Sequence, residues 1–283
     1  MAELNAIARR FEQGEVGLAT FSAPTAQAAL ELSVTAYDGI VFEAEHKPWD
    51  VPELRDALQY LLRRQQIFQA DTLQSRPTPL VRIPPNGGER SQWHAKQALD
   101  LGAYGIIWPH ITCVAEAVNA VAACRYPGSG RKTGGPRGIR GDSPVAAARY
   151  WGVAREEYYQ RAGVWSLDDD GEILVGIMIE DVEGVDNLPA ILDEVPGIGL
   201  VLIGEGDLSQ ELGVPRQYEH PDVLECKARI LAECQRREVP VGHPHVTAQN
   251  LESAVADGYR FLMSAPVTTY PVLECAASLT NRS

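Results

Sequence analysis

Ionisable side chains follow several short apolar runs of this 283-residue sequence, at the point where each run ends. In chain order these side chains are Glu43, Glu45 and His46, then Arg82, His110 and Glu180, and finally Glu205 and Asp207. Turns after ordinary buried strands are usually built from Ser, Asn, Asp and Gly. Acids, an arginine and histidines after five consecutive runs therefore indicate a reactive site.

Glu180 and Asp207 follow neighbouring runs, so their carboxylates are expected to lie close together. Two such carboxylates repel each other unless a cation lies between them. Hard divalent ions such as Mg²⁺ and Mn²⁺ bind carboxylate oxygens. Either acid alone would more often cap a helix, but the pair beside an arginine and a histidine favours a metal site.

The other polar residues at these ends offer acid–base and anion-binding chemistry. Arg82 interrupts an apolar run, where it could form a salt bridge with a nearby acid or bind a carboxylate or a developing enolate oxygen. His46 is a candidate general base. His110 could donate to a carbonyl oxygen or simply pack. The role of His243-Pro244-His245, after a later run, stays open.

Eight apolar runs without polar alternation are typical of a parallel sheet whose outer face is covered. The predicted strands are Val16–Phe21, Gly39–Glu43, Leu80–Ile83, Gly105–Trp108, Ile173–Ile179, Gly199–Ile203, Val239–Gly242 and Tyr259–Met263. Between them lie helical patterns at Val51–Gln65, Arg90–Leu101, Val114–Cys124, Val185–Asp193, Pro221–Arg237 and Ala248–Asp257. Asp50 and Thr247 are the expected N-caps of the first and last helices, and Gly102 and Gly258 the expected ends of two of them.

Eight strand–helix alternations in about 250 residues predict a (β/α)8 TIM barrel that forms a single domain over residues 1–283. An open doubly wound sheet would need a glycine-rich turn after its first strand, but Ser22–Thr25 contains no glycine. The glycine-rich segment at residues 126–144 is too long for a plain connector, so we expect a lid-like insertion there.

Composition excludes several classes of protein. The net charge is 25 − 38 = −13, which argues against a nucleic-acid binder and against docking on anionic lipid. No apolar run approaches the roughly 20 residues that span a bilayer. The first 15 residues lack the apolar core of a signal peptide, and the five scattered cysteines contain no CxxC pair. These features predict a cytoplasmic protein.

Several motifs occur together in one order along the chain. They are Glu43-Ala44-Glu45-His46-Lys47-Pro48, Val81-Arg82, Trp108-Pro109-His110, Pro136-Arg137-Gly138-Ile139-Arg140-Gly141, Ile179-Glu180 and Ile203-Gly204-Glu205-Gly206-Asp207-Leu208-Ser209. This ordered set resembles the HpcH/HpaI aldolase family, the class II pyruvate aldolases, which include macrophomate synthase. The resemblance spans roughly residues 14–270.

The resemblance implies a barrel that assembles as a homo-oligomer, a hexamer built as a trimer of dimers, with an exchanged C-terminal helix. It implies that Glu180 and Asp207 hold Mg²⁺, Mn²⁺ or Co²⁺. Arg82 would contact the keto oxygen and stabilise the enolate. His46 would be the acid or base, with Asp100 as its orienting partner.

Two further assignments come from the same resemblance. The backbone N–H groups of Gly206 and Asp207 would bind the pyruvate carboxylate. His110 would contact the second substrate, as the corresponding position does in macrophomate synthase.

The sequence departs from the usual family pattern at four places. The usual DGEH is Glu43-Ala44-Glu45-His46, Met178 replaces a glutamine, and Gly128–Gly135 is an insertion. In the usual IGPADL motif, Glu205 adds a carboxylate that we expect close to the metal. These departures bear on the identity of the donor and the acceptor.

The expected function is a metal-dependent aldolase that cleaves or forms 4-hydroxy-2-oxo acids through a pyruvate-type enolate, with a 2-oxo acid and an aldehyde as its small-molecule partners. Oxaloacetate decarboxylation and a macrophomate-synthase-like bond-forming reaction are alternatives, and a non-catalytic binding protein is a more remote one. A phosphosugar isomerase would need glycine-rich loops after the last two strands, which Gly242–His245 and Ser264–Pro266 do not provide. No lysine stands at a predicted strand end, which argues against Schiff-base chemistry.

Overall fold

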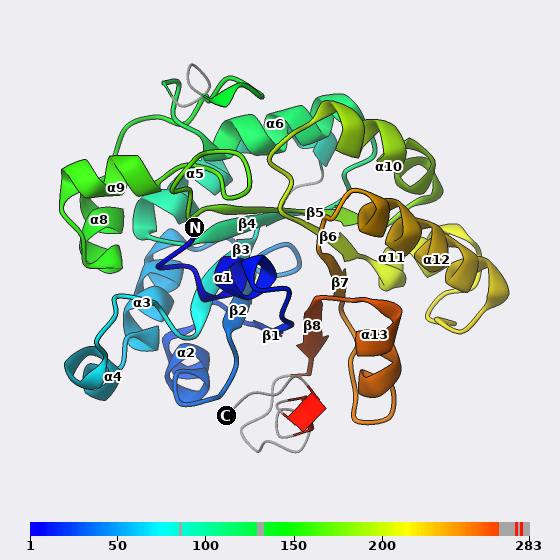
Figure 1. Cartoon of the computed structure of the whole chain (residues 1–283), viewed down its shortest axis with the longest axis horizontal. Helices are drawn as coiled ribbons and strands as arrows, with labels where there is room; N and C mark the ends of the chain where they lie inside the picture. The colour runs from blue at the N-terminus through cyan, green and yellow to red at the C-terminus, as the bar shows by residue number, and fades with distance from the viewer. Residues whose placement is uncertain (85–86, 129–132, 266–274, 277, 280–283) are drawn as a thin grey trace.

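Eight parallel strands close into a barrel in sequence order, and helices surround it (Figure 1), which confirms the predicted (β/α)8 TIM barrel. The computed structural model describes residues 1–84, 87–128, 133–265, 275–276 and 278–279. The strands are β1 (Gly17–Ser22), β2 (Gly39–Glu43), β3 (Thr78–Arg82), β4 (Gly105–Trp108), β5 (Leu174–Ile179), β6 (Leu200–Ile203), β7 (Val241–His243) and β8 (Phe261–Ser264).

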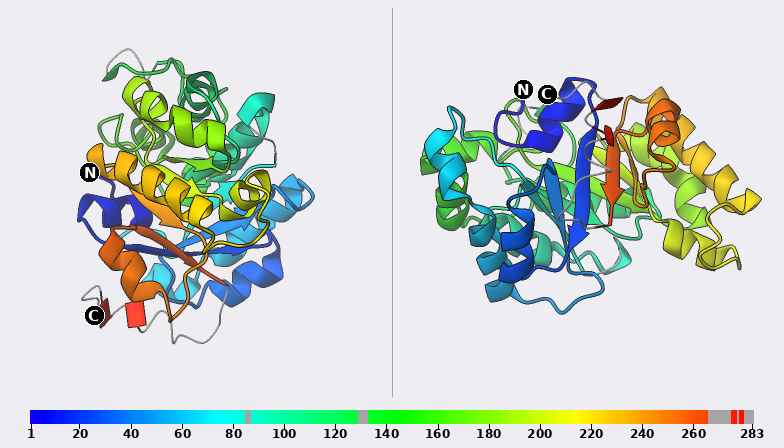
Figure 2. Two further views of the ribbon diagram at one scale, coloured as in Figure 1. Left: turned by 90° about the vertical axis from the view of Figure 1, so that its right-hand side faces the viewer. Right: turned by 90° about the horizontal axis from the view of Figure 1, so that it is seen from below.

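The strands are buried on both faces. Every residue of β2, β3, β4, β5, β6 and β7 is buried, because one face fills the barrel and the other is covered by helices (Figure 2). This burial is the reason that continuous apolar runs identified the strands. The bounds predicted for β2 and β4 are confirmed, and those of the other strands differ by one or two residues at one end or both.

The described residues form one short 3₁₀ helix and the following α-helices. The 3₁₀ helix is Gly87–Glu89. The α-helices are α1 (Ala6–Glu12), α2 (Ala26–Leu32), α3 (Val51–Leu61), α4 (Arg64–Gln69), α5 (Gln92–Leu101), α6 (Val114–Cys124), α8 (Val145–Trp151), α9 (Arg155–Arg161), α10 (Val182–Glu194), α11 (Glu205–Glu211), α12 (Pro221–Arg236) and α13 (Leu251–Asp257).

Local chemistry fixes several helix ends as predicted. The Asp50 side chain accepts from the backbone N–H of Glu53 at the start of α3. Gly102 and Gly258 end α5 and α13 with left-handed φ values of 111° and 103°, a conformation that glycine adopts without steric cost.

Several helix predictions were wrong at one end, among them the end of the first predicted helix and the start of the last. The helix predicted over Val51–Gln65 stops at Leu61, because Leu62 has an extended backbone, and a separate helix α4 follows. The last helix begins at Leu251 with Asn250 as its N-cap, not after Thr247. The Thr247 N–H instead donates to the side chain of Asn250, which closes a turn ahead of the helix.

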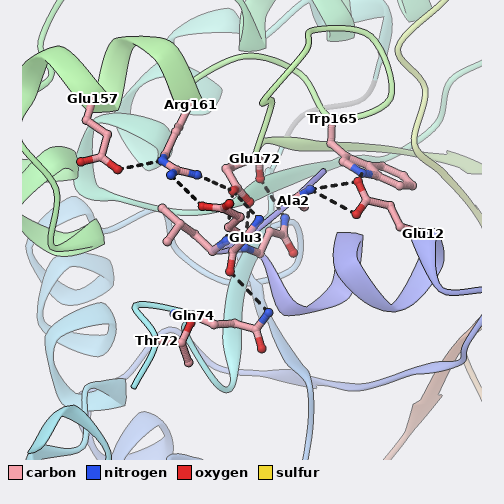
Figure 3. Close-up of polar contacts among 11 residues, drawn as sticks. Ala2, Glu3, Glu12, Thr72, Gln74, Glu157, Arg161, Trp165 and Glu172 are labelled. Atoms are coloured by element: carbon pink, nitrogen blue, oxygen red, sulfur yellow. Dashed lines mark hydrogen bonds and ion pairs between the residues drawn. The ribbon is translucent and has the colours of Figure 1, made fainter. Parts of the chain in front are cut away.

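The N-terminal segment closes the end of the barrel where the strands begin. Ile7 of α1 is fully buried, and its side chain fills the space beside Gly17 and Gly39. The buried carboxylate of Glu172 accepts three backbone N–H groups, from Glu3, Leu4 and Asn5, at 2.7–3.0 Å. Figure 3 shows this carboxylate among the N-terminal residues. The opposite end of the barrel is therefore the one that is open to a substrate.

The described part of the segment predicted to be lid-like, residues 126–144, folds back on the end of α6. The N–H groups of Ile139 and Arg140 donate to the carbonyls of Ala122 and Arg125 at 2.9 Å. Gly138 lies so close to the backbone that a Cβ would approach the Arg125 carbonyl oxygen to 2.3 Å. This part of the segment therefore packs beside the helix that it follows.

The exchanged C-terminal helix implied by the resemblance falls largely on residues 266–274 and 280–283, which lie outside the described residues. In the part of the chain that is described, no helix combines the length and apolar character needed to cross a bilayer.

Candidate active site

A cavity of about 480 Å³ lies where the strands end, and five of the predicted residues line it. These are His46 after β2, Arg82 at the end of β3, Glu180 after β5, and Gly206 and Asp207 in the first turn of α11 after β6. Parallel strands bring their carboxyl ends to one face of a barrel, so residues up to 161 positions apart meet here.

Glu43 organises one wall of this cavity. It is the register partner of Arg82 across the β2–β3 ladder, and its Oε2 accepts from Arg82 Nε at 2.7 Å and also contacts Nη2. Its Oε1 accepts the backbone N–H groups of Glu45 and His46 at 2.8 and 3.1 Å. One buried carboxylate thus holds the arginine and shapes the loop that carries His46.

The Arg82 guanidinium is held from several sides. Its Nη1 lies 2.9 Å from Glu45 Oε2 and 3.6 Å from the sulfur of Met178. Its carbon lies 4.5 Å from the centre of the Phe21 ring, a cation–π distance. The arginine therefore presents a fixed positive charge at the cavity wall.

Glu180 is almost wholly buried, with 1% of its side chain exposed. Its Oε1 accepts the backbone N–H of His110 at 2.9 Å. Its other oxygen lies over Gly204, where a Cβ would come within 2.1 Å. Burial raises the pKa of Glu180 to about 7.

Glu45, His110 and Glu180 each offer one ligand atom, and the three atoms lie within 4.8 Å of one another. His110 Nε2 is 3.4 Å from Glu45 Oε1 and 3.9 Å from Glu180 Oε1. The hydrogen bond to Glu45 raises the pKa of His110 to about 9. His110 is therefore an imidazolium at neutral pH, and its charge lies between the two acids.

The half-buried Asp207 lines the same cavity but lies outside this close group. Its negative charge raises the pKa values of both His110 and Glu180. The first N–H groups of a helix have no acceptor within the helix, so those of Gly206 and Asp207 are available at the cavity. Beside Gly206, no heavy atom of the described structure lies within 4 Å of a Cβ position.

Within the chain, the structure does not bring Asp100 against His46. The Asp100 carboxylate accepts from Arg140 Nη2 at 3.0 Å, and Arg140 also donates to the hydroxyl of Tyr158. The His46 ring lies 3.6 Å from Glu45 Oε2, and 62% of it is exposed. Asp100 is on α5, whose helical turn directs this side chain toward Arg140 in the same chain.

Glu205 also differs from expectation, because its side chain turns toward Lys227 and His245. Burial alone would raise the pKa of Glu205, but hydrogen bonds from His245 and Lys227 outweigh burial and lower the pKa to about 2. Its charge is thus neutralised locally, so it adds little to the negative field beside Glu180.

Sequence reasoning missed the roles of Glu43 and Glu45. Both acids were visible after β2, but their partners Arg82 and His110 come from β3 and from the loop after β4. The register of β2 on β3 was the missing signal, since it sets Glu43 opposite Arg82.

The segment at residues 126–144 was expected to cover the site, but none of its described residues lines this cavity. Several of them, including Tyr126, Arg140 and Asp142, line a separate cavity of about 880 Å³ together with Tyr159 and Asp168.

The residues at the mouth fit a hard divalent cation. Glu45, Glu180 and Asp207 supply carboxylate oxygens, the ligands that Mg²⁺ and Mn²⁺ prefer. Glu45 Oε2 is buried and makes no hydrogen bond of good geometry, although it lies near Arg82. A buried acid of this kind is stabilised by a cation.

Comparison with known proteins identifies relatives of this barrel. The sequence profile of the HpcH/HpaI aldolase/citrate lyase family matches residues 20–266. A hydroxypyruvate/pyruvate aldolase of Roseobacter denitrificans is 30% identical over 83% of this chain and 79% of its own. A 2-keto-3-deoxy-L-rhamnonate aldolase of Klebsiella pneumoniae is 32% identical over 82% of this chain and 74% of its own.

Solved structures share the same architecture. The crystal structure of an HpcH/HpaI aldolase/citrate lyase family protein from Burkholderia cenocepacia superposes with a TM-score of 0.75 and 25% identity. The superposition covers 98% of each chain. The likeness therefore extends over the whole barrel.

Proposed function

The chain belongs to the HpcH/HpaI aldolase/citrate lyase family, and from this premise we propose that it is a metal-dependent aldolase that cleaves or forms 4-hydroxy-2-oxo acids through a pyruvate-type enolate. The observation that carries the proposal is the meeting of a buried acid, Glu180, with a fixed guanidinium, Arg82, in one cavity at the strand ends. The relatives, a hydroxypyruvate/pyruvate aldolase and a sugar-acid aldolase, support a 2-oxo acid donor.

We assign Glu180 and Asp207 as the ligands of a divalent ion, Mg²⁺, Mn²⁺ or Co²⁺, with Glu45 beside them. When bound, the ion supplies a Lewis acid that stabilises negative charge on a 2-oxo acid. The close group of Glu45, His110 and Glu180 supports this assignment, because its three ligand atoms lie close enough to share one cation. With the ion bound, the ring of His110 would either move away from Glu45 and Glu180 or stay beside them as a positive charge in addition to the ion.

The cleavage step follows from charge. A base removes the proton of the C4 hydroxyl, the C3–C4 bond breaks, and its electron pair passes to C3 and on to the enolate oxygen. The products are an aldehyde and the enolate of pyruvate, which a proton at C3 converts to pyruvate. Arg82 stabilises the enolate oxygen, because its guanidinium is held in place before the charge develops.

His46 is the acid or base that we assign to the proton transfers. Its backbone is fixed by Glu43 and its ring is open to the cavity. Asp100 as an orienting partner would have to reach it from another subunit, since the two are not in contact within the chain. We expect a homo-oligomer, a hexamer. Light scattering of the purified protein measures the mass of the assembly and tests this expectation.

The backbone N–H groups of Gly206 and Asp207 are suited to the substrate carboxylate. We assign His110 to the second substrate, because its Nε2 lies within 3.9 Å of Glu180, which lines the cavity, and is a donor for a carbonyl oxygen. Both assignments extend the family resemblance to positions of this chain.

The test is a screen of aldehydes with pyruvate, hydroxypyruvate and oxaloacetate, each with Mg²⁺, Mn²⁺ or Co²⁺ added. We expect carbon–carbon bond formation with at least one aldehyde, and loss of product after chelation. Loss of CO₂ from oxaloacetate without any aldol product would support the decarboxylase alternative. Inactivity with every donor and metal would support a binding protein and contradict the proposal.

A further inference from the structure

Two histidines lie at the end of β7, His243 as its last residue and His245 just after it, and the chemistry assigned above uses neither of them. His245 lines the same cavity as Glu180 and Asp207, and half of its side chain is exposed. The neighbouring His243 is buried, and its Nδ1 accepts the backbone N–H of His245 at 3.2 Å. His245 is therefore the histidine of this pair that a molecule in the cavity can reach.

Two contacts fix the His245 ring, and a third holds its backbone. Its Nδ1 is 2.7 Å from Glu205 Oε2, and its ring stacks on Tyr218 with centroids 5.0 Å apart and planes 9° apart. Its backbone carbonyl accepts from the Asn250 side chain at 3.0 Å. A half-exposed side chain that is held this firmly loses little further freedom when it binds a ligand.

Glu205 holds the His245 ring in this orientation. Its side chain is 1% exposed and also contacts the ammonium group of Lys227. Because a carboxylate accepts hydrogen bonds, the hydrogen of the His245 ring lies on Nδ1. With that hydrogen on Nδ1, Nε2 is the acceptor atom of the ring, and it makes no hydrogen bond with any residue in the described part of the chain.

Strand order sets His245 opposite the enolate-stabilising residue. Arg82 ends β3 and His245 follows β7, and these strands lie four positions apart in the closed barrel of eight. A donor molecule that lies between Arg82 and Glu180 therefore leaves the space on the β7 side for the hydroxyl-bearing end of the acceptor aldehyde. The other end of this aldehyde is the part assigned to His110.

We infer that His245 is a specificity-determining residue, whose Nε2 accepts a hydrogen bond from a hydroxyl group of the acceptor aldehyde, and that Glu205 is its positioning residue. The inference rests on the proposed aldolase function and deepens it, since it names hydroxylated aldehydes as the preferred acceptors. An aldehyde without a hydroxyl group has no donor for Nε2, so Nε2 would lose its water without gaining a hydrogen bond in return.

The test compares two acceptors of nearly equal size, glycolaldehyde and propanal, with pyruvate as the donor. The wild-type protein is expected to prefer glycolaldehyde in kcat/KM. One neutral hydrogen bond is worth about three- to tenfold in this ratio. In His245→Asn and His245→Phe the ratio is expected to fall by that factor, through a higher KM for glycolaldehyde.

The two variants separate recognition from a structural role. The asparagine amide can still donate to Glu205 but has no atom at the position of Nε2, whereas phenylalanine keeps only the stacking on Tyr218. His245→Gln, which restores an acceptor near the Nε2 position, is expected to recover part of the preference. His220→Asn removes an imidazole that caps α12 outside this cavity and serves as the control for effects on folding, which thermal unfolding of each variant measures.

A wild-type ratio that persists in His245→Asn would overturn the inference, as would a wild-type protein without a preference for glycolaldehyde. Proton–deuterium exchange of the pyruvate methyl group distinguishes a failure of the role of His245 from a failure of the proposed function. Metal-dependent exchange without aldol product from either aldehyde contradicts the role of His245 alone. Absence of exchange contradicts the proposed function as well.

Discussion

Glu43 is the residue on which this wall of the cavity depends. One of its oxygens holds Arg82, and the other accepts the N–H groups of Glu45 and His46. Glu43 reaches the guanidinium because Arg82 lies directly across the ladder. The arginine thus owes its fixed orientation to a fork-shaped contact, which an ammonium group cannot reproduce.

Arg82→Lys is expected to lower the rate of pyruvate methyl exchange by about 100-fold or more. A lysine keeps the positive charge but loses the planar contact with Glu43 and the stacking on Phe21. The rate is measured by NMR in D₂O at saturating metal. Arg55→Lys, which alters an exposed arginine paired with Asp56, is the control. A rate within threefold of wild type would remove Arg82 from its assigned role.

Glu180 predicts how metal affinity depends on pH. Burial raises the pKa of its carboxyl to about 7 in the metal-free protein, and a carboxyl must lose its proton before it binds a cation. Below pH 7 the proton competes with the metal, so the affinity for Mn²⁺ is expected to fall by up to about tenfold per pH unit, whereas above pH 8 it levels off. Calorimetric titration at pH 5.5, 6.5 and 8 measures this, and a constant affinity would contradict it.

The sequence identified the residues of the site more fully than their partners. His46, Arg82, Glu180, Gly206 and Asp207 were expected at strand ends, and they line one cavity. Within the chain, the expected partner of His46, Asp100, contacts Arg140 instead, because Asp100 lies on a helix whose contacts come from tertiary packing. Side-chain pairs between different elements are set by register and helix rotation, which a single sequence does not contain.

At the scale of elements, apolar runs located the strands and glycines located helix ends. The start of α13 was wrong because Thr247 and Asn250 are both good capping residues, and only the turn between them decides which caps the helix. The true start of α10 also lies ahead of the predicted Val185, because the Asp181 side chain accepts from the N–H of Gly184. Boundaries thus depend on hydrogen bonds of a few residues, whereas the existence of each element follows from its apolar pattern.

The turn between β6 and α11 supports Glu180 sterically. Gly204→Ala would bring a Cβ within 2.1 Å of Glu180 Oε2, so the carboxylate must shift. We expect Mn²⁺ affinity to fall by about 10- to 100-fold, the range seen when the support of a metal ligand is altered. Calorimetry measures the affinity. Gly128→Ala, where no described heavy atom lies within 4 Å of the new Cβ, is the control, and equal affinity in both variants would contradict the prediction.

At the scale of the whole molecule, the eight strand–helix alternations predicted the barrel. They did not predict how the end where the strands begin is closed. That end is sealed by residues near the N-terminus, whose backbone N–H groups donate to Glu172 just before β5 (Figure 3). The contact joins residues about 170 positions apart, and no local pattern in either segment indicates it. It couples the first residues of the chain to the stability of the entire barrel.

Glu172→Gln is expected to lower the free energy of unfolding by about 2–4 kcal/mol, because the amide NH₂ group faces N–H donors and leaves some of them unsatisfied. Urea denaturation measures the change. Glu157→Gln removes another partner of Arg161, the exposed i,i+4 pair on α9, and is expected to cost about 0.5 kcal/mol. Equal losses of unfolding free energy in the two variants would show that the buried hydrogen bonds of Glu172 contribute no more than the exposed ion pair.

The central claim is that the acids at the strand ends hold a divalent ion that makes pyruvate enolise. Proton–deuterium exchange at the pyruvate methyl group tests it most directly, in the wild-type protein with Mn²⁺, after treatment with EDTA, and in Glu180→Ala. We predict exchange only in the metal-loaded wild type, with recovery when Mn²⁺ is returned to the chelated protein. Exchange that continues after chelation, or at the wild-type rate in Glu180→Ala, would contradict the account.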